Sequence, residues 1–154
     1  MLTGGYRTLQ LAVAALAGAL LANPAMAETL ITEHEAQLPP DNSVLRSIEP
    51  GPEVIPVYPP QAAQGMIQSP FEFKVRFRPH GGTQIDLDSL QVLYKRGQGI
   101  YLTSRVKPYV HADGIDMPNA QVPAGTHRIV ISVKDSVGHL GQADIRFDVE
   151  NENK

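Results

Sequence analysis

The sequence of 154 residues contains no cysteine. Disulfide bonds and thiol catalysis are therefore excluded. A bacterial lipoprotein anchor is excluded as well, because its lipid is attached to a cysteine at the cleavage site. Exported proteins often gain stability from disulfides, so a chain without them has to rely on its hydrophobic core.

The chain also lacks any block of like charge. It has 13 basic and 16 acidic residues and a formal net charge of −3. The first 27 residues hold a single charge, Arg7, so the rest of the chain carries 12 basic and 16 acidic residues, a net charge of −4. Dispersed charge of this kind argues against nucleic-acid binding and against polybasic attachment to a membrane. No stretch after residue 27 is apolar enough to cross a bilayer, so we expect no membrane span in that part of the chain.

The start of the chain has the three-part pattern of a secretory signal. Arg7 precedes an apolar run from Leu9 to Ala22, and small residues at 25–27 follow a helix-breaking Asn-Pro pair. The run is too short to span about 30 Å of hydrocarbon, which favours a cleaved signal over a membrane anchor. We therefore predict a signal peptide at 1–27, cleaved after Ala27, and a bacterial mature protein that is periplasmic or secreted.

Residues 28–52 have the composition of an irregular leader. The segment holds four prolines, many acids and no aromatic residue, and its few apolar residues follow no sustained period. It cannot bury enough apolar surface by itself to offset the entropy of ordering it. We expect only short helical turns, near 32–37 and 42–48. We interpret the segment as a spacer, with a tail that orders on contact with a partner as the alternative.

The next part of the chain, residues 53–150, shows repeated alternation of apolar and polar residues, which is the signature of half-buried strands. The clearest examples are 71–78 and 142–149. All four phenylalanines of the chain fall on the inward faces of these two segments: Phe71, Phe73, Phe77 and Phe147. Because the two segments lie far apart in the sequence, we expect them to supply one core between two sheets.

Six further short strands are predicted between turn-forming residues, at 54–58, 85–94, 100–103, 106–110, 115–122 and 126–135. The segment 115–122 contains Pro118 and is expected to be at best a ragged strand. No apolar run with helical spacing is present, which argues against an α/β fold. The prediction is an all-β domain over 53–150, an immunoglobulin-like antiparallel β-sandwich of about seven strands, with a short tail at 151–154.

The segments 126–135 and 142–149 form the predicted closing hairpin. Two registers keep their inward faces matched, one with Arg128 opposite Asp148 and the other with Lys134 opposite Asp144. Either register offers one exposed charge pair worth roughly 0.2–1 kcal/mol. Burial of each large inward side chain is worth roughly 1.5–3 kcal/mol, so burial should decide the pairing.

Three short motifs of this domain match a known family. They are a Ser-Leu-x-Val strand, a (Leu/Val)-Pro-x-Gly-x-(His/Tyr) corner and a Val-x-Asp-x-x-Gly turn. The matching residues are Ser89, Leu90 and Val92; Val122, Pro123, Gly125 and His127; and Val133, Asp135 and Gly138. Over roughly 54–149 the chain resembles bacterial extracytoplasmic immunoglobulin-like domains. The resemblance implies a sandwich with a role in binding, spacing or assembly rather than catalysis.

Three of the five histidines, His80, His111 and His139, fall in predicted loops. No pair of histidines has a recognised ligand spacing, and a metal site needs three or four donors in fixed geometry. The three are nevertheless the candidate metal ligands, with Met66 and Met117 as soft donors for copper. Loop histidines without a ligand are the simpler interpretation.

Several other polar residues are assigned structural roles. His127 follows the Pro-Ala-Gly corner, where a ring N–H can tie the turn to a nearby carbonyl. Asp135 is expected to cap the turn ahead of Gly138 by accepting backbone N–H bonds. The acid pairs Asp86/Asp88 and Asp113/Asp116 have oxygen ligands that suit Ca²⁺ but not the full spacing of a calcium loop. We interpret them as solvated turn acids.

Tyr94, Tyr101 and Tyr109 are the candidate partner contacts, because tyrosines on a sheet face can stack on peptides or sugars. The sequence contains no convincing catalytic or cofactor-binding constellation. It therefore predicts an exported, non-enzymatic immunoglobulin-like module without a cofactor, which binds a protein or cell-envelope partner. The alternatives are a periplasmic copper or zinc carrier that uses the loop histidines, and a carbohydrate-binding module.

Overall fold

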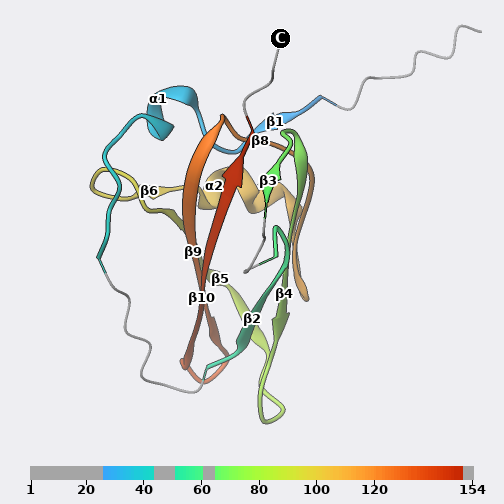
Figure 1. Ribbon diagram of the computed structural model, residues 1–154. Coiled ribbons are helices and arrows are strands. Elements are labelled where there is room, and N and C mark those ends of the chain that lie inside the picture. The colour runs from blue at the N-terminus through green and yellow to red at the C-terminus, as the bar shows by residue number, and fades with distance from the viewer. Residues whose placement is uncertain (1–25, 44–50, 61–64, 151–154) are drawn as a thin grey trace, which may run out of the picture.

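A computed structural model describes residues 26–43, 51–60 and 65–150, and these form two β-sheets packed face to face (Figure 1). The strands of the first sheet are β1 (Glu28–Thr29), β8 (Gly114–Gln121), β4 (Phe71–Arg78) and β2 (Glu53–Tyr58), in that order, with β7 (Val110–His111) paired to β8. Those of the second are, in order, β3 (Met66–Ile67), β10 (Leu140–Val149), β9 (Gly125–Asp135), β5 (Ile85–Tyr94) and β6 (Ile100–Tyr101). The predicted all-β sandwich is confirmed, but its sheets are mixed rather than antiparallel throughout, because β1 pairs with β8 and β3 with β10 in parallel. Most of the predicted signal peptide, most of the predicted turn at 42–48 and the tail at 151–154 lie outside the described residues.

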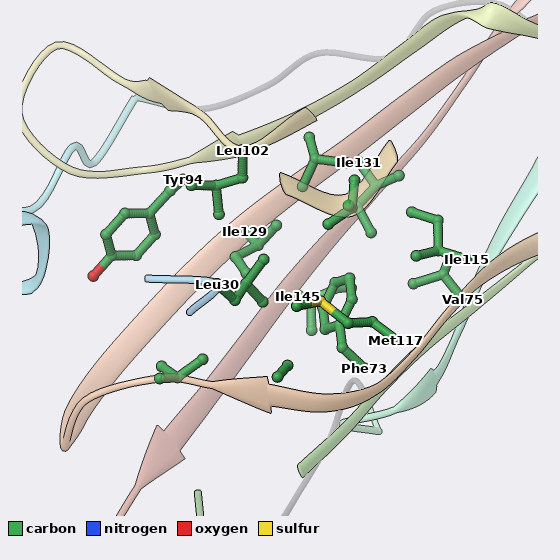
Figure 2. Close-up of a cluster of buried hydrophobic side chains, with 14 of the residues drawn as sticks. Leu30, Phe73, Val75, Tyr94, Leu102, Ile115, Met117, Ile129, Ile131 and Ile145 are labelled. Carbon is green, nitrogen blue, oxygen red and sulfur yellow. The ribbon is translucent and has the colours of Figure 1, made fainter. Parts of the chain in front are cut away.

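The core lies between the two sheets and is filled from both ends of the domain. Phe73 and Val75 of β4 are 0% exposed, as is Ile145 of β10, and Figure 2 shows all three in one apolar cluster. The rings of Phe71 and Phe147 meet edge to face with their centroids 5.6 Å apart. The prediction that the two phenylalanine-bearing strands share one interior is confirmed.

The closing hairpin forms as predicted, but in neither predicted register. Arg128 lies opposite Arg146, and Lys134 lies opposite Leu140, so the predicted pairs Arg128–Asp148 and Lys134–Asp144 are both wrong. Arg128 reaches Asp144 diagonally across the strands instead, with its Nε 2.9 Å from a carboxylate oxygen.

The turn of this hairpin is capped by Asp135, as predicted, and the turn sets the register. The Asp135 carboxylate accepts N–H bonds from Val137 at 3.0 Å and from His139 at 2.9 Å, and its carbonyl accepts one from Gly138 at 3.0 Å. Burial works against the charged carboxylate, but these bonds and the His139 ring hold the pKa of Asp135 below its usual value. The capped turn fixes the loop length, and loop length fixes strand register.

β8 is a continuous strand inside the first sheet, between β1 and β4, rather than the ragged strand that Pro118 predicted. The pairing with β4 shifts between Phe71 and Phe73, so that Pro118 and Asn119 face a single β4 residue. A bulge of this kind accommodates proline, which has no N–H to give to the ladder.

The segment after β6 is helical, so the predicted strand at 106–110 is wrong. It consists of α2 (Thr103–Val106) and a 3₁₀ turn, η1 (Lys107–Tyr109). Leu102 and Val106 are both 0% exposed, and a helical turn puts residues four apart on one face. α2 packs against β5 and η1 contacts β8, so this segment covers one side of the sandwich (Figure 1). No helix in the described part of the chain is long and apolar enough to cross a membrane.

The first part of the predicted irregular leader, residues 28–36, is ordered into a strand and a helical turn. The expectation that it is only a spacer is therefore wrong for this part. β1 pairs in parallel with β8, and α1 (Glu33–Ala36) follows. Between them Leu30 and Ile31 are 0% and 1% exposed, so these residues belong to the core. The helical turn expected near 32–37 is confirmed, and it begins with a capping box in which Thr32 and Glu35 each bond the other's backbone N–H.

We call residues 28–43 the strap, because they pass from the first sheet over one end of the sandwich to the second sheet (Figure 1). Arg105 binds the Glu35 carboxylate of the strap with both terminal nitrogens, at 2.7 and 2.8 Å, and donates to the Leu30 carbonyl at 2.8 Å. The Arg105 hydrogen bonds lower the pKa of Glu35 to about 2, against the effect of burial. Glu35 is therefore charged at neutral pH.

The second half of the strap is held in the same manner. The guanidinium of Arg96 donates to the Leu38 carbonyl at 2.9 Å. Lys95, only 4% exposed, bonds the Asp41 carboxylate and, at 2.6 Å, the Ser43 hydroxyl. The bonds from Lys95 and Ser43 lower the pKa of Asp41 to about 2. Lys95 and Arg96, which follow β5, and Arg105 of α2 thus all form hydrogen bonds to the strap.

Two glycines allow the segment before β2 to lie directly against the start of β10. A Cβ on Gly141 of β10 would lie 1.8 Å from the Pro52 carbonyl oxygen, and one on Gly51 would lie 2.1 Å from the Leu140 carbonyl. Only glycine permits backbones to approach this closely. The segment that leads into β2 is therefore pressed against the start of β10.

Replacing Leu30 with alanine tests whether the strap belongs to the folding unit. We expect Leu30→Ala to lower the free energy of unfolding by about 2–5 kcal/mol, because it leaves a cavity in the core. The matched control is Val137→Ala in the β9–β10 turn, at a side chain that is 64% exposed, with an expected change within about 0.5 kcal/mol. Urea denaturation measures both, and equal effects of the two variants would contradict a strap that is part of the core.

Candidate functional site

The three candidate histidines do not assemble a metal site. A backbone hydrogen bond of 2.8 Å joins the turns that carry His80 and His139, while His111 lies in β7. No group of three or more His, Cys, Asp or Glu side chains that could hold a metal ion occurs among the described residues. His139 places its Nδ1 3.3 Å from the Asp135 carboxylate, so it contributes to the capped turn.

The two methionines considered as soft donors are far from equivalent. Met117 is 0% exposed in the core, so its proposed role beside loop histidines is wrong. Met66 is 66% exposed on β3. It lies at an edge of the second sheet, on a different element from the histidine-bearing turns.

The acid pairs are engaged in local contacts. On the outer face of the first sheet, Asp113 forms an ion pair with Arg76, and Asp116 lies 3.1 Å from the Lys74 ammonium. In the second sheet, the Asp86 carboxylate accepts the backbone N–H of Asp88 at 3.2 Å. These contacts agree with the interpretation of the four acids as turn and surface residues.

The structure separates the three tyrosines that were expected to share a contact surface. Tyr94 is 0% exposed, so its assignment to that surface is wrong. It faces inward because the inward positions of β5 are the even-numbered ones at its end, Leu90, Val92 and Tyr94. Tyr109 is half-buried against the core, and its hydroxyl donates to the Glu28 carboxylate of the strap. Tyr101 alone of the three is largely exposed, at 63%.

Tyr94 instead belongs to a buried polar cluster with His127. The Tyr94 hydroxyl lies 2.9 Å from His127 Nδ1, and His127 Nε2 lies 2.8 Å from the Pro123 carbonyl. A carbonyl oxygen can only accept, so Nε2 carries a hydrogen; in the neutral ring Nδ1 then accepts from the tyrosine hydroxyl. The predicted tie between this ring and the corner is confirmed.

The surroundings of His127 favour its neutral form. The side chain is 1% exposed. Burial lowers the pKa of His127 below its usual value, and the charge of Arg96 acts in the same direction. The bond to Pro123 and the charge of Asp148 oppose this shift without reversing it. A protonated ring would also lose the acceptor that Tyr94 now uses.

A row of rings connects this corner to the molecular surface. His127 packs on Phe147 with ring centroids 5.5 Å apart, and Phe147 contacts Phe71. Phe71 in turn meets Tyr58 edge to face at 6.1 Å. Tyr58 is 38% exposed, so the aromatic row of the core ends at the surface beside β2.

The row ends at an open hollow of about 460 Å³ between the edges of the two sheets, β2 of the first and β3 of the second. Its lining residues are Tyr58, Met66, Ile67, Gln68, Pro70, Phe71 and Glu72. Tyr58 and Met66 stand at its rim with 38% and 66% of their surface exposed. Including their neighbour Val57, three of the six large apolar side chains that are exposed in the described part of the chain lie on these two edge strands.

A larger and more polar groove adjoins the hollow and shares Gln68 and Pro70 with it. This groove of about 820 Å³ lies between the start of the strap, the β3–β4 connection and the β8–β9 corner. Pro123 of that corner, which His127 holds, forms part of its wall. The two hollows therefore form a continuous recessed surface at one end of the sandwich.

Sequence reasoning did not find the hollow. The sequence predicts a strand that ends at Tyr58 and offers Met66 only as a soft metal donor, and nothing in their local pattern indicates that the two side chains meet. The one available signal is that the predicted strand 54–58 stands between prolines, which suits a sheet edge, and edge strands are where partners add. The second edge, β3, has only two residues, too few for an alternation to be recognised.

The neutral, buried His127 predicts a specific dependence of stability on pH. Because its folded-state pKa is lowered, the unfolded chain binds more protons below about pH 6.5, and stability falls as the pH drops through that value. The expected slope is at most about 1.4 kcal/mol per pH unit from this residue. The measurement is urea unfolding of wild type and His127→Gln between pH 7.5 and 5, and their difference removes the contribution of the exposed histidines. An equal slope in both proteins would contradict a neutral His127.

Comparison with protein-family models, curated proteins and solved structures finds no match to this chain. What this chain binds is therefore inferred from its own surface, and from the hollow between β2 and β3 in particular.

Proposed function

We propose that this chain is an exported, non-enzymatic immunoglobulin-like module that binds a protein partner of the cell envelope through the hollow between β2 and β3. The observation that carries the proposal is the exposure of the large side chains of Tyr58 and Met66 at an open recess, where the two sheets end. Export is supported by the secretory pattern of residues 1–27.

The chemistry of the hollow suits an extended polypeptide segment. Five of its seven lining residues have aliphatic or aromatic side chains, and the amide of Gln68 and the carboxylate of Glu72 lie among them. An edge strand offers backbone N–H and C=O groups to a strand of a partner, while an adjacent pocket accepts one of its side chains. Aromatic residues backed by a packed core lose little entropy on binding, and such residues commonly dominate binding energy. Tyr58, which rests on Phe71, is of this kind.

This proposal replaces the tyrosine surface expected from the sequence. Tyr94 is inside the core and Tyr109 is bonded to the strap, so the sugar-stacking platform that the three tyrosines would have formed is not retained as a proposal. The metal-carrier alternative is not retained either, because the described residues bring no three donors together.

Site-specific photocrosslinking in cells tests the proposal. A photoreactive phenylalanine analogue at position 66 should crosslink a discrete envelope protein, because that side chain stands at the rim of the hollow. The same analogue at position 137, which is equally exposed in the β9–β10 turn, should not. A crosslinked species of the same size at both positions would indicate unspecific capture and contradict the proposal.

Alanine at the rim tests the energetic contribution of the hollow. With the crosslinked partner purified, Tyr58→Ala should raise the dissociation constant at least about 10-fold, since truncation of an aromatic anchor costs 1–2 kcal/mol or more. Tyr101→Ala, at an exposed tyrosine of β6, is the matched control and should leave the constant unchanged. If Tyr101→Ala weakened binding and Tyr58→Ala did not, the contact would lie at the surface expected from the sequence instead.

A further inference from the structure

The strap is bound to the rest of the domain as a peptide ligand is bound to a receptor. Its backbone pairs with the edge of β8, where the N–H of Leu30 donates to the Gln121 carbonyl at 2.9 Å. Two consecutive aliphatic side chains, Leu30 and Ile31, enter the core. A carboxylate at Glu35 is held by both terminal nitrogens of Arg105. Main-chain pairing, apolar anchors and a bidentate carboxylate contact are the recurring elements of peptide recognition.

The cations that hold the strap donate hydrogen bonds to its backbone carbonyls as well as to its carboxylates. Arg105 donates to the carbonyl of Leu30 and Arg96 to that of Leu38. The bridge between Pro40 and Arg96, together with the bond of 2.8 Å from Gly97 N–H to the Pro39 carbonyl, adds further main-chain contacts. The domain thus forms a continuous site along the strap, from β8 to the β5–β6 turn.

The strap and its site are distant in the sequence. The side-chain contacts between them join residues separated by between 52 and 87 positions. The strap therefore emerges first from synthesis or export, while its site is complete only after β9 has formed. Contacts of such long separation form late, and before then a chain has both a free strap and an empty site.

The helical turn of the strap is stabilised from within the strap. Its helix α1 begins with a capping box made by Thr32 and Glu35. These two bonds therefore stay with the strap wherever it binds.

We infer that the strap site of one molecule accepts the strap of a second copy of this chain, so that two copies exchange straps reciprocally. Each exchanged strap makes the same contacts as in the single chain, and exchange of an identical element is a low-cost route to a dimer. The exchanged dimer forms during folding at high protein concentration. This inference does not depend on the proposed function, because the strap lines no part of the hollow between β2 and β3.

Charge reversal at the Glu35–Arg105 pair tests the exchange directly. Glu35→Arg and Arg105→Glu each place like charges together within one chain. In a reciprocally exchanged pair of the two variants, both contacts again join opposite charges. We expect co-refolding of the two mature chains at high concentration to yield at least 10-fold more 1:1 dimer than refolding of either alone, as measured by size exclusion with light scattering.

The double variant Glu35→Arg/Arg105→Glu is the matched control, since it restores the pair within one chain and should give mainly monomer. If the co-refolded mixture contained no more dimer than the separate samples, with both variants folded by circular dichroism, the exchange would be excluded.

A second measurement covers the case in which a charge-reversed variant does not fold. Thr29 and Gln121 are both exposed and lie side by side in the β1–β8 pairing, and the chain has no native cysteine. Thr29→Cys and Gln121→Cys chains, co-refolded at high concentration, should give a heterodimer with a short thiol crosslinker. Thr29→Cys/Gln121→Cys in one chain, refolded dilute, is the control for reach and should give a crosslinked monomer. A crosslinked control without any heterodimer would overturn the inference.

Discussion

The structure depends above all on the dry contact between the inward face of β4 and those of β9 and β10. Phe73 and Val75 on one side and Ile129, Ile131 and Ile145 on the other are 0% exposed. Burial of such side chains contributes roughly 1.5–3 kcal/mol each, more than surface ion pairs contribute. The chain has no disulfide bond that could stabilise it instead of this contact. The segments around the core therefore have to keep water out of it.

The core is closed at its edges in three different ways. Leu30 and Ile31 of the strap fill one end, and Leu102 with Val106 of α2 covers one side (Figure 2 shows Leu30 and Leu102 in the same cluster). On the remaining side Gly51 and Gly141 bring two backbones into direct contact. Lys95 and Arg105 form ion pairs with the strap, and Arg96 donates a hydrogen bond to one of its carbonyls. The strap therefore closes one end of the core.

The closure of the core is incomplete at the hollow between β2 and β3. The aromatic row that begins at the buried His127 ends there in Tyr58, whose ring is supported from behind and open to solvent in front. A rigid, half-exposed aromatic next to an edge strand is well suited to bind a partner, because little conformational freedom remains to be lost. In the proposed function, a partner bound at this place rests on the same packing that stabilises the fold.

The sequence by itself determined the features that depend on local periodicity. The inward rows of β4 and β10, the capped turn at Asp135 and the tie of His127 to its corner follow from residue type and a period of two. Only the tertiary structure decided the rest, because those features come from contacts between distant segments. Leu30 and Ile31 are core residues because the strap brings them between the two sheets, and Tyr109 is held at the strap by its bond to Glu28. Tyr58 and Met66 form one surface only because two sheets end side by side.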